Sequence, residues 1–231
     1  SRSNTHRPVV HFQAPPGDRV AGEMETFFGW FEDTGAARRP IVHAAVAHLW
    51  FLTIHPFSDG NGRVGRAIAD LVLARAYPHV APYVSLSRQI QRERADYYEA
   101  ISTAQRGDVD VTAWVRWFLG CYARALQHTR ATIDVLLRAD AFWRDYAHIA
   151  LNDRQRSVLQ RYLRGDFEGW LSTSKYVKLA KTSPDTAQRD LAALVRHGIL
   201  VPNPTKGPRT SYRLTAPSDS HGDEPGEEGE A

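Results

Sequence analysis

The residues best suited to chemistry lie in one run, His55-Pro-Phe-Ser-Asp-Gly-Asn-Gly-Arg-Val-Gly-Arg66. An apolar segment precedes this run, and we expect a helix to begin near Gly60. The N-terminus of a helix leaves backbone N–H groups free and carries partial positive charge, so it favours anions. Gly60 and Gly62 would let the backbone approach a ligand closely. Arg63 and Arg66 are three residues apart and share one face of that helix. The pattern therefore indicates a polyphosphate-binding loop.

Two further side chains of the loop could supply acid–base and metal chemistry. A histidine ordinarily titrates near pH 6.5, so His55 can accept a proton at neutral pH. Asp59 can supply the single carboxylate that Mg²⁺ typically takes beside substrate phosphates. Each residue also has a structural alternative: Asp59 as a helix cap, Arg66 paired with Asp70, and His55 packed in the core. These alternatives together do not explain the order of residues in this run. Glycines in helical turns cost roughly 0.5–1 kcal/mol each relative to alanine, so another interaction should compensate for them.

The composition is that of an ordinary folded protein of one or two domains. The 231 residues are 42% hydrophobic and 24% charged, which excludes a wholly disordered or disulfide-stapled chain. The single cysteine, Cys121, lies in an apolar helical pattern and is expected in the core. No apolar run approaches the ~20 residues of a membrane span, and no signal peptide is evident. We therefore expect a cytoplasmic protein without a membrane partner.

The charge is unevenly distributed. The chain has 29 Lys and Arg against 26 Asp and Glu, and six of the acidic residues lie in 218–231. The rest is strongly basic, which indicates either a polyanionic ligand or a solvated basic surface.

The first part of the chain is predicted to be almost entirely helical. A short β-prone run at 9–12 precedes it and ends at Pro15 and Pro16. The stretch 40–54 is apolar nearly all round, so we expect it to form the buried central helix. Ser87 and Asp110 are candidate caps for later helices. The predicted helices are 20–32, 40–54, 61–76, 87–105 and 110–147, the last in one or two pieces.

The pattern changes after residue 151. A helix is predicted from 153, capped by Asn152 or Asp153, and a short helix follows the serines and threonine at 172–174. A further helix would be capped by Asp185 and would stop at Gly198. Two β-prone runs, 199–201 and 210–215, then predict a hairpin. This order of elements is typical of a winged helix.

At every fixed position, His55–Arg66 matches the Fic family motif, His-Pro-Phe-x-x-Gly-Asn-Gly-Arg-x-x-Arg, which is a specific pattern. The runs His43-Ala-Ala-Val-Ala-His48-Leu-Trp-Phe, VHFQAPP, Arg94…Tyr97-Tyr98 and Thr112-Ala-Trp114 also resemble that family. The resemblance covers roughly 8–130, and the later part resembles the winged-helix appendage of a bacterial branch.

The resemblance implies a mainly α fold. A Fic-type helical bundle with a short β-hairpin flap would be followed by a winged helix-turn-helix domain. The expected divisions are a loose N-terminus at 1–8, a Fic domain at 9–130 with its flap at 9–16, a connecting helix at 131–151, a winged helix-turn-helix domain at 152–215, and a disordered acidic tail at 216–231.

Fic enzymes typically transfer AMP from ATP to a hydroxyl side chain of a target protein. The resemblance implies that His55 is the general base and that Asp59 holds Mg²⁺, with Mn²⁺ as the alternative ion. Phe57 would be an apolar anchor of the loop. The implied ATP-binding residues are Asp59, Gly60, Asn61 and Gly62, with Arg63 on phosphate oxygens and Arg66 on the γ-phosphate.

The resemblance also implies where the nucleoside and the target would bind. Tyr97, Tyr98 and Gln105 would border the nucleoside. The two tyrosines point about 100° apart on a helix, so at most one can lie flat on the base, and both could instead be packed aromatics. The flap residues Val10, His11, Phe12 and Gln13 would align a target segment through main-chain hydrogen bonds.

Two further features are not expected here, a metal site and the family's inhibitory helix. His43 and His48 are five residues apart on a helix, so they do not share a face and a metal site between them is not predicted. The family's inhibitory pattern, Ser/Thr-x-x-x-Glu-Gly/Asn, does not occur, because Arg164 and Glu224 stand four residues before the Glu of the two Glu-Gly pairs. An inhibitory helix would have to come from an upstream segment or another chain.

Three functions remain open from the sequence. The first is a protein adenylyltransferase that uses Mg-ATP; the second is a winged-helix DNA-binding regulator whose Fic domain only senses nucleotide; and the third is a Fic enzyme with a different donor. Residues 153–214 hold twelve Lys and Arg against five Asp and Glu, which suits duplex DNA, with Gln188 and Arg189 as the best base readers. A basic protein-interaction or dimerisation module is the alternative, so homo-oligomerisation stays open.

Overall fold

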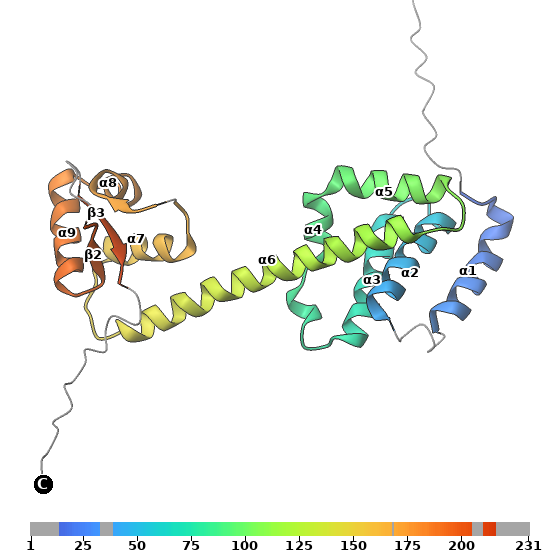
Figure 1. The fold of residues 1–231 in the computed structure, drawn as a ribbon, viewed down its shortest axis with the longest axis horizontal. Helices are drawn as coiled ribbons and strands as arrows, with labels where there is room; N and C mark the ends of the chain where they lie inside the picture. Colours follow the sequence, from blue (N-terminus) through green and yellow to red (C-terminus); the bar gives the residue numbers. More distant parts are fainter. Residues whose placement is uncertain (1–13, 33–38, 168, 205–209, 216–231) are drawn as a thin grey trace, which may run out of the picture. The chain divides into compact units, whose positions relative to one another are not determined.

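The computed structural model describes residues 14–32, 39–167, 169–204 and 210–215, and the chain divides into two units, Ser1–Arg130 and Ala131–Ala231. The protein is mainly helical (Figure 1), as predicted. In the first unit the helices are α1 (Gly17–Glu32), α2 (Pro40–Ile54), α3 (Asn61–Ala76), the short 3₁₀ helix η2 (Ala81–Tyr83), α4 (Leu86–Arg92), α5 (Arg94–Arg106) and the first part of α6 (Thr112–Asp145).

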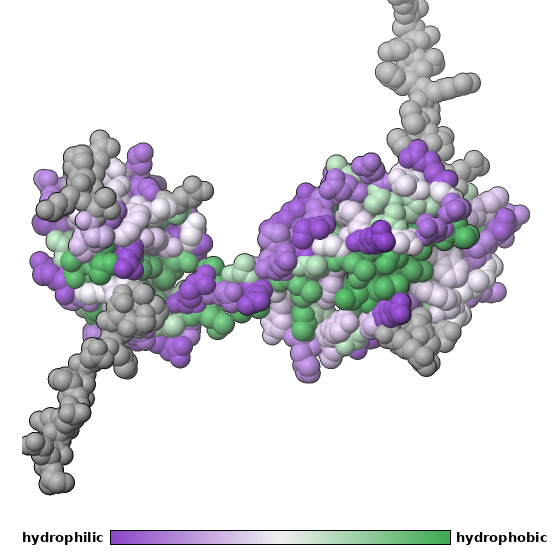
Figure 2. Space-filling view, viewed as in Figure 1, coloured by the Kyte–Doolittle hydropathy of each residue, from purple (hydrophilic) through white to green (hydrophobic). Residues whose placement is uncertain are grey.

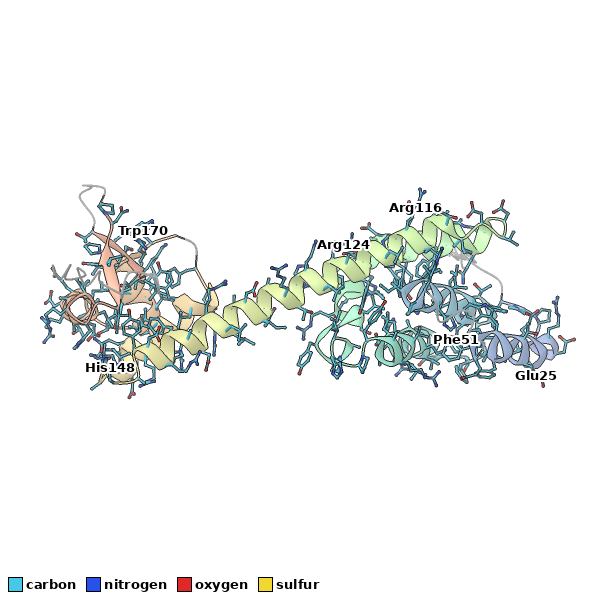
Figure 3. All side chains as sticks on the ribbon, turned by 60° about the horizontal axis from the view of Figure 1, so that its bottom comes forward. Glu25, Phe51, Arg116, Arg124, His148 and Trp170 are labelled. Atoms are coloured by element: carbon cyan, nitrogen blue, oxygen red, sulfur yellow. The ribbon has the colours of Figure 1, made fainter. Side chains whose placement is uncertain are left out.

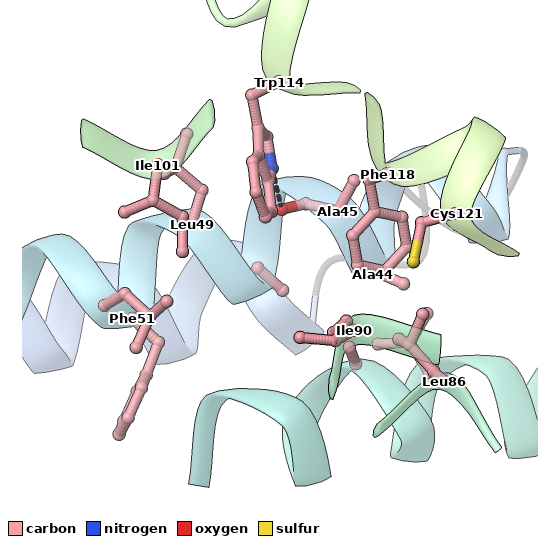
Figure 4. Packing of buried hydrophobic residues seen from close by; sticks show 14 of the residues in the cluster. Ala44, Ala45, Leu49, Phe51, Leu86, Ile90, Ile101, Trp114, Phe118 and Cys121 are labelled. Carbon is pink, nitrogen blue, oxygen red and sulfur yellow. Dashed lines mark hydrogen bonds between the residues drawn. The ribbon is translucent and has the colours of Figure 1, made fainter. Parts of the chain in front are cut away.

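Helix α2 is the centre of the first unit, as its apolar sequence predicts. Nine of its residues are buried, and a proline occupies its first turn, where a missing N–H costs nothing. Helix α6 is fixed to α2 by the Trp114 indole, whose Nε1 donates to the Ala45 carbonyl at 2.8 Å. Figure 4 shows this bond beside Phe118 and Cys121, which are both fully buried. Cys121 is therefore a core residue, as expected.

One predicted helix is wrong in its bounds. The stretch 87–105 forms two helices, α4 and α5, and Ser85 rather than Ser87 caps the first by accepting from the Arg88 N–H. Glu93 separates the helices with a non-helical backbone. Its carboxylate accepts from Nε and Nη2 of Arg124 on α6, each at 2.6 Å, and Figure 3 labels Arg124 on that helix. A contact between distant parts of the chain therefore accompanies a break that local periodicity does not reveal.

The second unit is a small sheet packed against short helices. Its elements after the end of α6 are α7 (Asp153–Arg164), β1 (Leu171–Ser172), α8 (Thr173–Ala180), α9 (Pro184–Arg196), β2 (Leu200–Pro202) and β3 (Ser211–Leu214). The strands are antiparallel in the order β1-β3-β2, with Leu171 opposite Tyr212 and Leu200 opposite Leu214. The predicted helices and hairpin are present, and β1 is an additional strand.

Two of the helix caps in this unit agree with the sequence and one does not. Asn152 forms a capping box with Gln155, and Ser172 caps α8. Helix α9 is capped by Ser183 instead of Asp185, because Pro184 takes the first helical position and the Ser183 hydroxyl accepts from the Thr186 N–H.

Some expectations lie outside the described residues. They include the strand at 9–12, the flap residues 10–13, the loose 1–8 and the tail 216–231. In the described ranges, no helix combines the length and apolarity needed to cross a bilayer. Figure 2 shows mixed hydrophilic and apolar surface on the face of each unit that it presents.

A buried carboxylate organises the polar interior of the second unit. Asp190 on α9 is 6% exposed. It accepts hydrogen bonds from Asn152 Nδ2 at 3.0 Å, from Arg154 Nε at 3.0 Å and from the Tyr176 hydroxyl at 3.0 Å. Burial alone would raise the pKa of Asp190, but the hydrogen bonds from Arg154, Asn152 and Tyr176 outweigh it and hold the pKa below its usual range. This network ties α7, α8 and α9 together.

We predict that Asp190→Asn destabilises the second unit by on the order of 2 kcal/mol, because donors in the network lose their acceptor. A carboxyl with a lowered folded pKa stabilises above its unfolded pKa of about 3.9, and this contribution disappears as pH falls through the folded pKa. The wild-type urea midpoint should therefore drop more below pH 4 than the variant's does. Gln188→Ala, an exposed change on the same helix, should stay within about 0.5 kcal/mol at every pH; parallel pH curves for wild type and Asp190→Asn would contradict the assignment.

Candidate active site

The turn between α2 and α3 carries the Fic-like motif. Its first residue, His55, has φ 53° and ψ 53°, and its backbone N–H caps α2 by donating to the Phe51 carbonyl at 3.0 Å. Gly60, with φ 89°, precedes the first residue of α3. A positive φ is uncommon for a residue other than glycine and costs free energy. The strained turn at His55 brings the histidine to the loop that leads into the N-terminus of α3, so the predicted helix start is confirmed.

The His55 ring has one nitrogen engaged and one available. Its Nδ1 lies 3.3 Å from the Leu52 carbonyl oxygen. A carbonyl can only accept, so this contact requires the hydrogen on Nδ1 and leaves the Nε2 lone pair free. The side chain is exposed, and Nε2 is therefore able to accept a proton from a ligand.

Asn61 holds the loop in shape. Its side chain is 3% exposed, its Oδ1 accepts from the Phe57 N–H at 3.1 Å, and its Nδ2 donates to the Phe57 carbonyl at 2.5 Å. The Asn61 amide is thus used inside the protein, and only its backbone N–H is left for an anion. The Phe57 ring, expected to be an apolar anchor, is half exposed, and its centroid lies 6.2 Å from that of Phe51. The Phe57 backbone is therefore held by Asn61, while its ring contributes only partial packing.

Asp59 and Arg63 form an exposed pair at the mouth of the loop. One carboxylate oxygen of Asp59 accepts from the Gly60 N–H at 2.7 Å, and the other accepts from Arg63 Nη2 at 3.1 Å. Their side chains are 91% and 74% exposed, so the pair is weak and exchangeable. No group of three or more metal-ligating side chains occurs within the described part of the chain. A lone carboxylate fits Mg²⁺ that arrives with a nucleotide, because phosphates and water then supply the other ligands.

On the side of α3 that faces α2, Gly65 permits close packing of the two helices. A side chain there would place its Cβ 3.3 Å from both His48 Nδ1 and a methyl carbon of Leu52. His48 is fully buried and stacks on Trp114 with ring centroids 5.7 Å apart. Burial lowers the pKa of His48 to about 4. The neutral ring can therefore accept from the Tyr97 hydroxyl, which lies 2.9 Å from Nε2.

Tyr97 links this buried histidine to Arg66. Burial raises the pKa of Tyr97 to about 12, and the charge and hydrogen bonding of the Arg66 guanidinium oppose that rise. Tyr97 is only 3% exposed. Tyr97 therefore interacts with Arg66 from the protein interior and exposes little surface to a ligand.

The three residues expected around the nucleoside occupy different environments. Tyr98 is 57% exposed, and the Arg94 guanidinium lies 5.6 Å from its ring centroid. Gln105 donates to the Thr53 hydroxyl at 3.4 Å. The Tyr98 ring is thus exposed and can contact a nucleobase, whereas the Tyr97 ring is enclosed by the protein.

A cavity of about 480 Å³ adjoins these residues, and sequence reasoning missed several of its members. It is lined by Arg66, Tyr97 and Tyr98 together with Ser85, Ser87, Arg88, Ile90, Gln91 and Arg94. The signal in the sequence was the spacing of Arg88, Gln91 and Arg94 at intervals of three residues. That spacing predicts a shared helical face, although α4 and α5 are separate helices.

Part of the chain is similar to known proteins of one family. Residues 2–73 match the model of the Fic/DOC family. This part of the chain is therefore similar to a Fic-family domain. It is 36% identical over 119 residues to the protein adenylyltransferase Fic of Culex quinquefasciatus, a match that covers 50% of this chain and 22% of that protein. It is 34% identical over 131 residues to the Drosophila willistoni protein of the same name, covering 56% and 23%.

The chain therefore spans less than a quarter of the length of these curated relatives. Among solved structures, a Fic family protein from Desulfovibrio desulfuricans G20 matches with 26% sequence identity and a TM-score of 0.48, covering 91% of this chain and 58% of that one.

We predict that Gly62→Ala separates ligand binding from stability. An added Cβ would meet only Arg66 Nη1, at an ordinary 3.4 Å, and alanine is the better helix former by up to about 1 kcal/mol. Stability should stay the same or rise, while ATP affinity should fall about tenfold, because a methyl group would obstruct phosphate at the helix N-terminus. Thermal unfolding and ATP titration measure the two effects. Gly22→Ala in α1, where the added carbon meets nothing, should leave ATP affinity alone; equal affinity in wild type and Gly62→Ala would count against the site.

Proposed function

We propose that this protein transfers AMP from ATP to a Ser, Thr or Tyr hydroxyl of a target protein, with His55 as the general base. The observation that carries the proposal is the available Nε2 of His55, whose Nδ1 is turned to the Leu52 carbonyl at the start of the loop that leads into the N-terminus of α3. Relatives of the Fic domain bear the name protein adenylyltransferase. An available base beside an anion-binding helix end suits this reaction.

The reaction balances with the groups of the loop. The target hydroxyl oxygen forms a bond to the α-phosphorus of ATP, and the bond between that phosphorus and the oxygen bridging to the β-phosphate breaks. The hydroxyl proton passes to His55 Nε2, and inorganic pyrophosphate leaves. Catalysis of this kind depends mainly on positioning and on neutralisation of phosphate charge.

The phosphates would lie over the N-terminus of α3. The first backbone N–H groups of a helix, here those of Asn61 and Gly62, have no acceptor within the helix. Arg63 would leave Asp59 to contact phosphate oxygens, and Arg66 would hold the γ-phosphate. Asp59 would then be free for Mg²⁺, or Mn²⁺, carried by ATP. Such an ion supplies charge neutralisation on the phosphates.

Tyr98 and Gln105 are the side chains proposed to meet the nucleoside, with Tyr97 acting through Arg66. Docking of the target through residues 10–13 and a cytoplasmic location remain part of the same proposal.

The decisive experiment is incubation of the protein and a cell lysate with ATP labelled at either the α or the γ position. Transfer of α label alone to protein supports AMP transfer. Transfer of γ label indicates phosphorylation, and ATP binding without any transfer favours the nucleotide-sensing alternative.

We predict that His55→Ala lowers transfer by about 10²–10⁴-fold and leaves ATP affinity within about twofold. His79→Ala, another exposed histidine, is the matched control. Full activity in His55→Ala would remove the histidine from the mechanism.

A second candidate concerns the C-terminal unit, which we propose binds duplex DNA as a winged helix. The specific observation is its order of elements, α7-β1-α8-α9-β2-β3, with β3 between β1 and β2. Exposed basic side chains lie on α9 and at the end of α8; they are Lys178, Lys181, Arg189 and Arg196. Gln188 is exposed on the same helix as Arg189 and could reach base edges.

We predict that the full chain binds a mixed-sequence DNA duplex at low salt, measured by fluorescence anisotropy. Affinity should fall steeply with salt, and Arg189→Ala with Arg196→Ala should reduce the slope by about 0.9 for each lost phosphate contact. Arg116→Ala, an exposed change on α6 in the first unit, should not alter it. Absence of binding at low salt would favour a protein-interaction module.

A further inference from the structure

The cavity between α3, α4 and α5 is lined by three arginines. Arg66, Arg88 and Arg94 come from three different helices and line the same space of about 480 Å³. The other polar residues that line it are Ser85, Ser87, Gln91, Tyr97 and Tyr98, and none of the described Asp or Glu residues lines it. Such a set of donors without acceptor carboxylates selects for anions.

The carboxylates nearby are committed elsewhere. Among the described residues, none of the three arginines forms an ion pair within 4.0 Å. Asp70 acts on Arg66 through its charge but lines a different cavity, beside Tyr122. Glu93 is engaged by Arg124. Three guanidinium groups close together repel one another, and an anion in the cavity would relieve that repulsion.

Neighbouring aromatic side chains contact two of the three arginines, Arg66 and Arg94. The Arg94 guanidinium stands 5.6 Å from the Tyr98 ring centroid, and Ser85 caps the helix that carries Arg88. Tyr97, held by His48 at 2.9 Å, supports Arg66. Side chains that are held in advance lose less conformational freedom when a ligand binds, so Arg66 and Arg94 are partly prepared for an anion.

We propose that this cavity receives inorganic pyrophosphate, the leaving group of AMP transfer. The assignment rests on the proposed function, because AMP transfer releases pyrophosphate whereas transfer of the γ-phosphate does not. Arg66 belongs both to the proposed γ-phosphate site and to the cavity, so a pyrophosphate group freed from the α-phosphate can pass from Arg66 to Arg88 and Arg94 without losing its counter-charges. A single carboxylate of a peptide would neutralise only one of the three arginines, whereas pyrophosphate is compact and multiply charged.

Direct titration tests the site independently of catalysis. Sodium pyrophosphate is titrated into the full chain without metal or nucleotide and followed by calorimetry. We expect binding that weakens about tenfold or more in Arg88→Ala and in Arg94→Ala, because each removes charge-assisted hydrogen bonds. Arg92→Ala, an exposed arginine on α4 outside the cavity, is the matched control and should bind as wild type does. Arg88→Gln and Arg94→Gln, which keep the side-chain length, repeat the test should either alanine variant unfold.

Pyrophosphate affinity that is equal in wild type and in the Arg88 and Arg94 variants would overturn the assignment. Binding of a polyglutamate peptide in place of pyrophosphate would overturn it too, and would indicate an acidic protein partner.

Kinetics then distinguish a separate product site from an extension of the ATP site. In the Arg88→Ala/Arg94→Ala double variant, the inhibition constant of pyrophosphate should rise at least tenfold while KM for ATP changes less than threefold. Equal losses for both ligands would place the two arginines in the ATP site and overturn the proposal. If the protein transfers no AMP, the titration still reports whether pyrophosphate binds, so failure of the proposed function is distinguishable from failure of this site.

Discussion

The two hydrogen bonds between the Asn61 amide and the Phe57 backbone are the contact on which the loop geometry depends. They close the turn between α2 and α3 and are sheltered from water, because Asn61 is almost fully buried. His55 occupies a strained positive φ on the α2 side of that turn. The strain persists because the surrounding contacts over-determine it. A looser turn would let His55 relax toward an ordinary backbone conformation and away from the start of α3.

The contact of α3 with α2 extends this constraint into the core. Gly65 allows the helices to approach where His48 and Leu52 lie, and His48 in turn fixes Tyr97. The position of Arg66 therefore depends on a buried chain of side chains from α2 and α5. Burial keeps His48 neutral, so the histidine adds no positive charge beside Arg66.

The sequence predicts the parts of this arrangement that have a local cause. The apolar surface of α2, the glycine that precedes α3 and the capping box at Asn152 are each determined by a few adjacent residues. Other features depend on partners far away in the chain. The break at Glu93 coincides with its bonds to Arg124 on another helix, and only packing decides that Tyr97 is enclosed while Tyr98 is exposed. The role of the Asn61 side chain was missed. A helix N-terminus predicts that backbone N–H groups bind an anion, but it does not predict what the side-chain amide of Asn61 contacts.

The arginines of the site fall into two electrostatic classes. Arg63 already has a carboxylate partner in Asp59, so a phosphate must displace that partner. The gain in free energy is then the difference between the Arg63–phosphate and the Arg63–Asp59 interactions. Arg66, Arg88 and Arg94 make no such ion pair in the described part of the chain, so an anion there gains against water and mutual repulsion alone. Attraction for phosphate should thus increase from the exposed mouth of the loop toward the cavity behind Arg66. In the proposed reaction, such a gradient would favour movement of the pyrophosphate leaving group toward Arg88 and Arg94.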